Sequence, residues 1–107
     1  MDYPSDLDLL EFFEAEPNID GDIQTYHAQD SSGAAIAFSF NTSDDSVQTL
    51  LKHDERIVSL TSHECLTRMW IDGETLHAEV ESVSYRIRFS MVLRPFVRIE
   101  WSGIRTR

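Results

Sequence analysis

One five-residue segment of this sequence comes closest to a catalytic or metal-binding motif. It reads His63-Glu64-Cys65-Leu66-Thr67 and begins like H-E-x-x-H, in which two histidines one helical turn apart bind zinc. Thr67 stands where the second histidine would be, and a structural zinc site needs further ligands. We therefore expect no zinc site here, and the sequence indicates no other metal or cofactor.

The single cysteine offers a second chemical possibility, that of a nucleophile. Cys65 would need a histidine beside it, and His27, His53 or His77 could come near it in the fold. A lone cysteine more often packs as a small, half-buried side chain, and we favour that interpretation. One cysteine cannot form an internal disulfide, which is typical of a protein in a reducing compartment.

Two glutamates form the third candidate, because Glu79 and Glu81 share one face of a predicted strand. Such a pair could serve as the acid and the base of a glycosidase. However, Arg86 and Arg88 lie on the polar face of the strand expected to pair with it, so we predict cross-strand ion pairs instead. No nucleophile, base and oxyanion donor occur together, and we expect no enzymatic activity.

Two further pairs of residues have simple structural interpretations. Asp44 and Asp45 are adjacent, but the other ligands of an EF-hand calcium loop are absent. Trp70 and Trp101 are predicted to be core residues. The alternative for Trp70, which lies close to Asp72 in the sequence, is an anchor in a protein interface.

The first predicted element of secondary structure is a helix. Ser5 and Asp8 have the spacing of a capping box, and the apolar residues between positions 7 and 13 recur at i, i+3 and i+4. Pro17 is expected to end this helix, because its ring removes a backbone donor and clashes with the preceding turn. Residues 18–21 are predicted to form the exit turn.

Beyond the helix, apolar and polar residues alternate with a period of two, which is typical of strands. Asp72-Gly73 separates the runs 66–71 and 74–81 and predicts a hairpin in which both central residues adopt positive φ. The strongest predicted strands are residues 34–40, 76–80, 83–91 and 97–101, and weaker ones are 22–29 and 56–62.

Residues 44–53 allow two interpretations. Val47, Leu50 and Leu51 have helical spacing, whereas Val47, Thr49 and Leu51 alternate as in a strand. We favour a strand because the neighbouring segments are strands, and a helical turn remains the alternative. The predicted fold is therefore α+β and mostly β, with an N-terminal helix packed beside an antiparallel sheet of about six to eight short strands. Residues 1–107 are expected to form a single domain.

Charge is distributed unevenly along the chain, whose formal net charge is −10. Residues 1–30 contain nine carboxylates and no Lys or Arg, whereas residues 82–107 contain six arginines and one carboxylate, Glu100. A negative field repels nucleic acid and anionic membranes and attracts basic proteins. We therefore expect a basic protein partner, and neither direct nucleic-acid binding nor membrane binding. No basic and apolar leader follows Met1, so a cytoplasmic location is expected.

Three parts of the sequence together resemble a known group of proteins. They are the acidic N-terminal helix, the segment 46–51 and the ending Leu93-Arg94-Pro95-Phe96-Val97-Arg98-Ile99-Glu100-Trp101-Ser102. In these parts the chain resembles small acidic immunity proteins of bacterial polymorphic toxin systems, which include contact-dependent growth inhibition modules. The resemblance implies a cytoplasmic inhibitor that binds its cognate toxin domain, often a basic nuclease, and blocks the active or substrate-binding surface.

The resemblance transfers no interface residue, so the candidates for toxin binding rest on charge and position alone. An acidic secretion chaperone or adaptor that binds an effector protein is the alternative function, and it would usually form a stable dimer. The sequence leaves open whether the chain is a monomer or a homodimer. The toxin-binding candidates are Asp44, Asp45, Asp54, Glu55, Trp70, Asp72 and Glu74.

Overall fold

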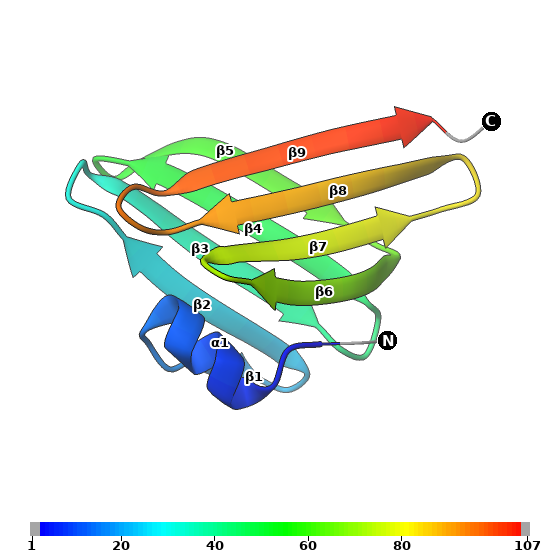
Figure 1. Cartoon of the computed structure of the whole chain (residues 1–107), viewed down its shortest axis with the longest axis horizontal. Helices are drawn as coiled ribbons and strands as arrows, with labels where there is room; N and C mark the ends of the chain where they lie inside the picture. Colours follow the sequence, from blue (N-terminus) through cyan, green and yellow to red (C-terminus); the bar gives the residue numbers. More distant parts are fainter. Residues whose placement is uncertain (1–2, 106–107) are drawn as a thin grey trace.

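A computed structural model describes residues 3–105, which form one helix and nine strands (Figure 1). Strands β1 to β5 form one antiparallel sheet and β6 to β9 a second, and within each sheet consecutive strands pair with each other. No helix among the described residues is long and apolar enough to cross a membrane. The elements are α1 (Asp6–Phe13), β1 (Asn18–Asp20), β2 (Ile23–Gln29), β3 (Ala34–Asn41), β4 (Ser46–His53), β5 (Arg56–His63), β6 (Leu66–Asp72), β7 (Thr75–Glu81), β8 (Tyr85–Val92) and β9 (Arg98–Arg105).

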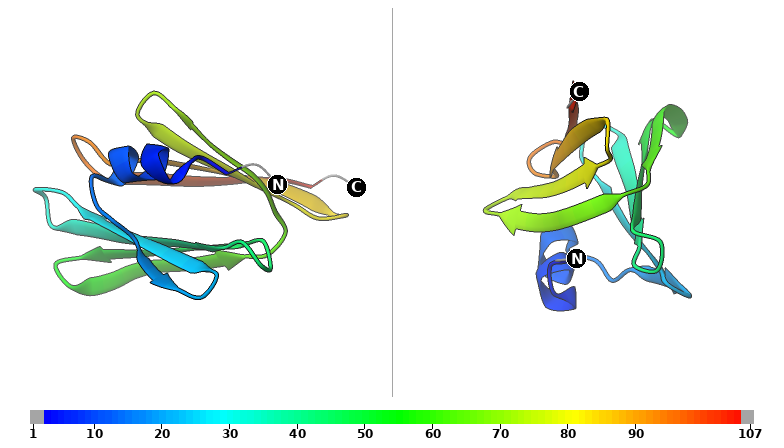
Figure 2. Two further views of the ribbon diagram at one scale, coloured as in Figure 1. Left: turned by 90° about the horizontal axis from the view of Figure 1, so that it is seen from below. Right: turned by 90° about the vertical axis from the view of Figure 1, so that its right-hand side faces the viewer.

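The two sheets face each other as separate layers, with α1 beside them (Figure 2). The core lies between the layers, where the buried rings of Phe38 from β3 and Phe89 from β8 stack at 5.8 Å. The mostly β fold with an N-terminal helix is confirmed. Two sheets replace the single sheet expected, because alternation shows that a strand has a buried face but not which sheet it joins.

The helix begins as predicted and ends earlier. The Ser5 hydroxyl accepts a hydrogen bond from the Asp8 amide at 3.1 Å and so caps the N-terminus. The expectation that Pro17 ends the helix is wrong, because Glu14 adopts a left-handed conformation with φ of 55° and ends it at Phe13. The helix buries Leu9, Phe12 and Phe13, whereas Leu7 remains exposed.

Three segments that the sequence left weak or ambiguous form regular strands. The segment 44–53 contains β4, so the strand interpretation is confirmed, and β2 and β5 confirm the weaker strands. Residues 18–20, in contrast, form strand β1 and not the predicted exit turn. β1 pairs with the start of β2, and Gly21 and Asp22 make the turn between them.

The hairpin between β6 and β7 lies where predicted but has a different turn. Asp72 pairs with Thr75, so the loop residues are Gly73 and Glu74 and not Asp72 and Gly73. Gly73 has φ of 62° and Glu74 is not in the left-handed region, as in a turn with glycine at its first central position. The prediction that both central residues adopt positive φ is therefore wrong here.

A carboxylate ties the two sheets together at one end. Asp30 follows β2, and its Oδ1 accepts hydrogen bonds from the Ser32 and Ala34 amides at 2.8 and 3.2 Å. Its Oδ2 accepts from the Val97 amide in the β8–β9 loop at 2.7 Å. These bonds, led by that from the Ser32 side chain, lower the pKa of Asp30 to about 2. Asp30 is thus a structural residue.

Candidate functional site

The outer face of the four-stranded sheet carries opposed charges. Arg88 on β8 donates to Glu79 on β7 at 3.1 Å, and Arg86 donates to Glu81 at 3.3 Å. We call these four residues the charge ladder. The predicted cross-strand ion pairs are therefore confirmed, and both carboxylates already hold guanidinium partners.

Trp70 lies on the same outer face. Its ring stacks on His77 with centroids 5.0 Å apart, and the guanidinium carbon of Arg68 lies 3.9 Å from the ring centroid. The expectation that Trp70 belongs to the core is wrong, because its neighbour Met69 takes the inward position on β6. Trp101 is partly buried against the core, as expected.

The residues of the zinc-like motif do not converge on a site. His63 ends β5 and its ring lies 5.0 Å from that of Trp101, while Cys65 follows in the link between the two sheets. Cys65 is exposed, so the half-buried interpretation is wrong. Among residues 3–105, no group of three or more His, Cys, Asp or Glu side chains could hold a metal ion.

The two candidate acids between β3 and β4 are part of the turn structure. Asp45 accepts a hydrogen bond from the Tyr3 hydroxyl at 3.1 Å, and its carbonyl accepts one from the Leu66 amide at 2.8 Å. Burial and the contact with Asp45 raise the pKa of Tyr3 to about 12. Asp44 accepts from the Ser46 hydroxyl at 2.7 Å. Both acids therefore have local partners.

Asp54 and Glu55 form the two-residue turn at the opposite end of β4. Both have positive φ, 50° and 69°, and the Asp54 amide donates to the Gly33 carbonyl at 3.0 Å. Strand β4 has eight residues, so roughly 24 Å of strand separates this turn from the β3–β4 turn. Figure 1 shows the β3–β4 turn at the right and the β4–β5 turn at the left. The candidate acids therefore do not form one patch.

The remaining candidates, Asp72 and Glu74, lie on the β6–β7 hairpin at the left of Figure 1. Gly73 and Glu74 share a hollow of about 380 Å³ with Asp8 and Glu11 of α1. Arg94 also lines this hollow. Glu74 is thus continuous with the acidic surface of the helix.

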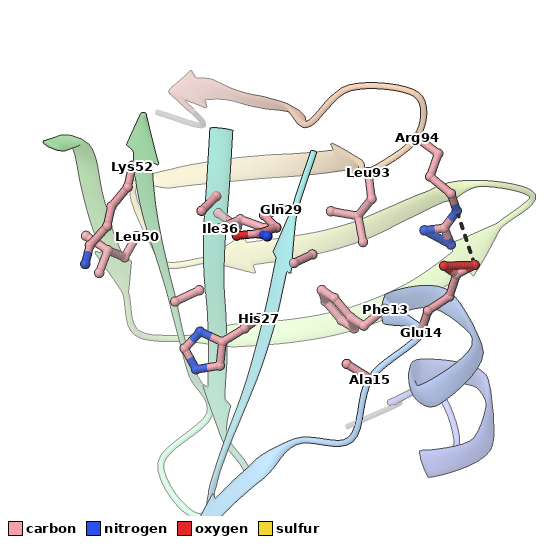
Figure 3. Close-up of a pocket in the computed structure, with 13 residues that line it drawn as sticks. Phe13, Glu14, Ala15, His27, Gln29, Ile36, Leu50, Lys52, Leu93 and Arg94 are labelled. Atoms are coloured by element: carbon pink, nitrogen blue, oxygen red, sulfur yellow. Dashed lines mark ion pairs between the residues drawn. The ribbon is translucent and has the colours of Figure 1, made fainter. Parts of the chain in front are cut away.

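The guanidinium of Arg94 is held at the end of α1. It donates to the Phe12 carbonyl at 2.7 Å and lies 3.9 Å from the Glu14 carboxylate. The same ion pair borders an open hollow of about 600 Å³, which His27 and Lys52 line on its other side (Figure 3). Arg94 therefore supports the helix C-terminus, where a cation is favourable.

A groove between α1 and β1 was missed by the sequence reasoning. Three of its apolar side chains are exposed to different degrees, Leu7 at 61%, Leu10 at 36% and Ile19 at 68%. The signal was the apolar stripe itself, which is wider than one face of an eight-residue helix can bury. The α1 groove has a volume of about 470 Å³ and is lined by Asp6, Leu7, Leu10, Glu16, Pro17, Ile19, Gln24 and Tyr26.

A second exposed apolar surface lies on β5, an edge strand of the larger sheet. Ile57, Val58 and Leu60 are exposed at 66%, 61% and 60%. We call these three residues the β5 surface. The whole strand, Arg56 to His63, contains no carboxylate.

No protein-family model matches this sequence, and no curated protein matches it. The fold is similar to that of a chain in the contact-dependent growth inhibition toxin–immunity protein complex from Klebsiella pneumoniae 342. The TM-score is 0.85 at 23% sequence identity, and the match covers 94% of this chain and 95% of that chain. At this identity the likeness shows that the two chains share a fold.

Proposed function

We propose that this chain is a cytoplasmic immunity protein that binds a cognate toxin domain and blocks its active or substrate-binding surface. The observation that carries the proposal is the structural similarity to a chain of a toxin–immunity protein complex, over 94% of this chain and 95% of the other. The resemblance of the acidic helix and the two sequence segments to immunity proteins supports the same function.

The charge of the chain favours the role of inhibitor over that of toxin. A nuclease toxin must approach a phosphate backbone, and a protein with a net charge of −10 is repelled by it. Four of the arginine and glutamate side chains neutralise each other in the charge ladder. The acids that remain attract a basic partner, and we infer that this partner is a toxin domain of the nuclease class.

Inhibition would be steric and electrostatic and would need no catalysis and no cofactor. Lysines and arginines that a nuclease uses to hold phosphate would instead pair with carboxylates of this chain. Acids at the rim of an interface mainly speed association, whereas desolvated contacts at its centre determine how slowly the complex dissociates. Of the candidate residues, five acids are exposed and suit the rim: Asp44, Asp54, Glu55, Asp72 and Glu74.

The proposal is tested with the toxin domain itself. The gene immediately upstream should encode a large secreted protein, and its C-terminal domain would be expressed in a laboratory bacterium with and without this chain. We expect growth only with the chain, a stable complex by size-exclusion chromatography, and inhibition of the nuclease activity of the purified domain. No rescue and no complex would contradict the proposal. A stable homodimer that binds the domain without inhibiting it would favour a secretion chaperone.

A further inference from the structure

The α1 groove is a preformed apolar depression. On its inner side α1 buries Leu9 and Phe13, and the Phe13 ring stacks on that of Tyr26 with centroids 4.6 Å apart. Tyr26 is 1% exposed and lines the groove, so the wall beneath it is held by core packing. Leu7 on α1 and Ile19 on β1 both line the groove and remain exposed. A partner could therefore bind here without a rearrangement of the sheet.

The charge around the groove has one sign. Asp6 and Glu16 line it directly, and Glu11, Asp20 and Asp22 belong to the same or adjoining elements. None of the described lining residues is Lys, Arg or His. Among residues 3–105 no ion pair involves these five acids. An apolar centre with an uncompensated acidic rim fits a partner with an apolar centre and a basic rim.

The β5 surface provides the contrast. Leu60 and Ile57 are exposed to nearly the same degree as Leu7 and Ile19, at 60% and 66% against 61% and 68%. Their strand has no carboxylate and includes Arg56. Exposure of apolar side chains is therefore equal in the two places. Asp54, Glu55 and Glu64 flank the ends of β5, whereas Asp6 and Glu16 line the α1 groove itself, beside its apolar side chains.

We propose that the α1 groove is the docking site for the basic toxin domain. An apolar side chain of the toxin would insert between Leu7, Leu10 and Ile19, and lysines or arginines beside it would pair with the carboxylates of Asp6 and Glu16. This inference rests on the proposed function. Such an arrangement places desolvated apolar contacts at the centre and charge pairs around them, as in the energetic centres of protein interfaces.

The experiment compares two matched double variants in binding to the purified toxin domain. Leu7→Ser with Ile19→Ser removes the apolar groove, and Ile57→Ser with Leu60→Ser removes equally exposed side chains of the same types elsewhere. We expect the groove variant to bind about tenfold more weakly or worse and the β5 variant to bind within about twofold of wild type. Circular dichroism and thermal melting would show that both variants fold.

The opposite result would overturn the inference: unchanged affinity in the groove variant, or the larger loss in the β5 variant. Sizing of the chain alone over a concentration range tests whether a second copy of the chain occupies the groove. A homodimer that wild type forms and the groove variant does not form would place that second copy in the groove. A wild-type chain that fails to bind the toxin domain at all would instead refute the proposed function. The two failures are therefore distinguishable.

Discussion

The α1 groove and the charge ladder both contain acids on the surface, and they differ in what surrounds the carboxylates. In the charge ladder, Glu79 and Glu81 receive hydrogen bonds from Arg88 and Arg86 on the neighbouring strand. In the α1 groove, Asp6 and Glu16 border exposed apolar side chains and have no ion-pair partner among the described residues.

Net charge is therefore a poor guide to a binding surface. The chain has ten more acids than cations, yet part of its acidic charge is used within the sheet, and another part holds turns together. A carboxylate with a strong internal partner gives up that partner if it binds a toxin. A carboxylate without one gains an interaction, and the two classes should respond differently to mutation.

The largest change in the free energy of unfolding should come from a mutation in the core. Phe38→Ala removes a ring with no exposed surface that stacks on Phe89, and should lower the free energy of unfolding by about 3–5 kcal/mol. Urea denaturation measures this loss. The control Leu60→Ala, at an exposed site, should change it by about 0.5 kcal/mol or less. A comparable loss in the control would contradict the position of the core.

The next largest loss of stability is expected at Asp30, because both oxygens of its carboxylate accept hydrogen bonds within the fold. Asp30→Asn weakens the bonds that the Ser32, Ala34 and Val97 amides donate, so the urea midpoint at neutral pH should fall. Asp20→Asn, in an exposed position on β1, serves as the control and should leave the midpoint unchanged. Toxin affinity should not change in Asp30→Asn, in contrast to variants of the α1 groove.

The pH dependence of the same variant gives a second test. The pKa of Asp30 is lowered from 3.8 to about 2, so the folded chain binds this proton less readily than the unfolded chain. Its stabilising contribution is complete above pH 3.8 and is lost as the pH falls towards 2. The stability difference between wild type and Asp30→Asn should narrow over this range. A difference that stays constant would show that ionisation of Asp30 is not involved.

A smaller effect on stability is expected at the hydrogen bond that the Tyr3 hydroxyl donates to the Asp45 carboxylate. Tyr3→Phe removes the hydrogen bond to Asp45 and should cost about 0.5–1.5 kcal/mol. Because the pKa of Tyr3 is raised from 10 to about 12, wild type should lose this advantage as the pH rises from 10 towards 12. Thermal melting of both proteins at pH 7 and above pH 10 measures it. An equal gap at both pH values would argue against the bond.

The smallest effect is expected in the charge ladder. Glu79→Gln with Glu81→Gln removes two ion pairs whose guanidinium partners are about half exposed, each worth about 0–1 kcal/mol, and should leave toxin affinity unchanged. Asp6→Asn with Glu16→Gln removes the same number of charges from the α1 groove, and should slow toxin association at low salt. Equal association rates in the two double variants would contradict the claim that the acids of the α1 groove, and not those of the charge ladder, speed association with the toxin.

Much of the fold could be predicted from the sequence because strand periodicity and capping are local signals. The ends of α1 and β1 could not, since Glu14 adopts positive φ and residues 18–20 are held in β1 by pairing with β2. The position of Trp70 depended on which residues of β6 face inward. The ion pairs between β7 and β8 followed from strand pairing alone.

The candidate site was less predictable for a related reason. The acids were chosen from turns, but only the structure shows that Asp45 holds Tyr3 and that Asp54 packs on the Gly33 loop. The α1 groove arises from exposure of Leu7 and Ile19, and exposure depends on how the helix docks against the sheets. A sequence pattern reports that an apolar stripe exists but not which part of it stays uncovered.

Hydrogen exchange of the backbone amides, with and without the toxin domain, would locate the surface of this chain that binds the toxin. Binding at the α1 groove should slow exchange in residues 6–20 and leave residues 56–63 of β5 and 85–92 of β8 unchanged. Slower exchange in β5 or β8 with no change in residues 6–20 would contradict the account.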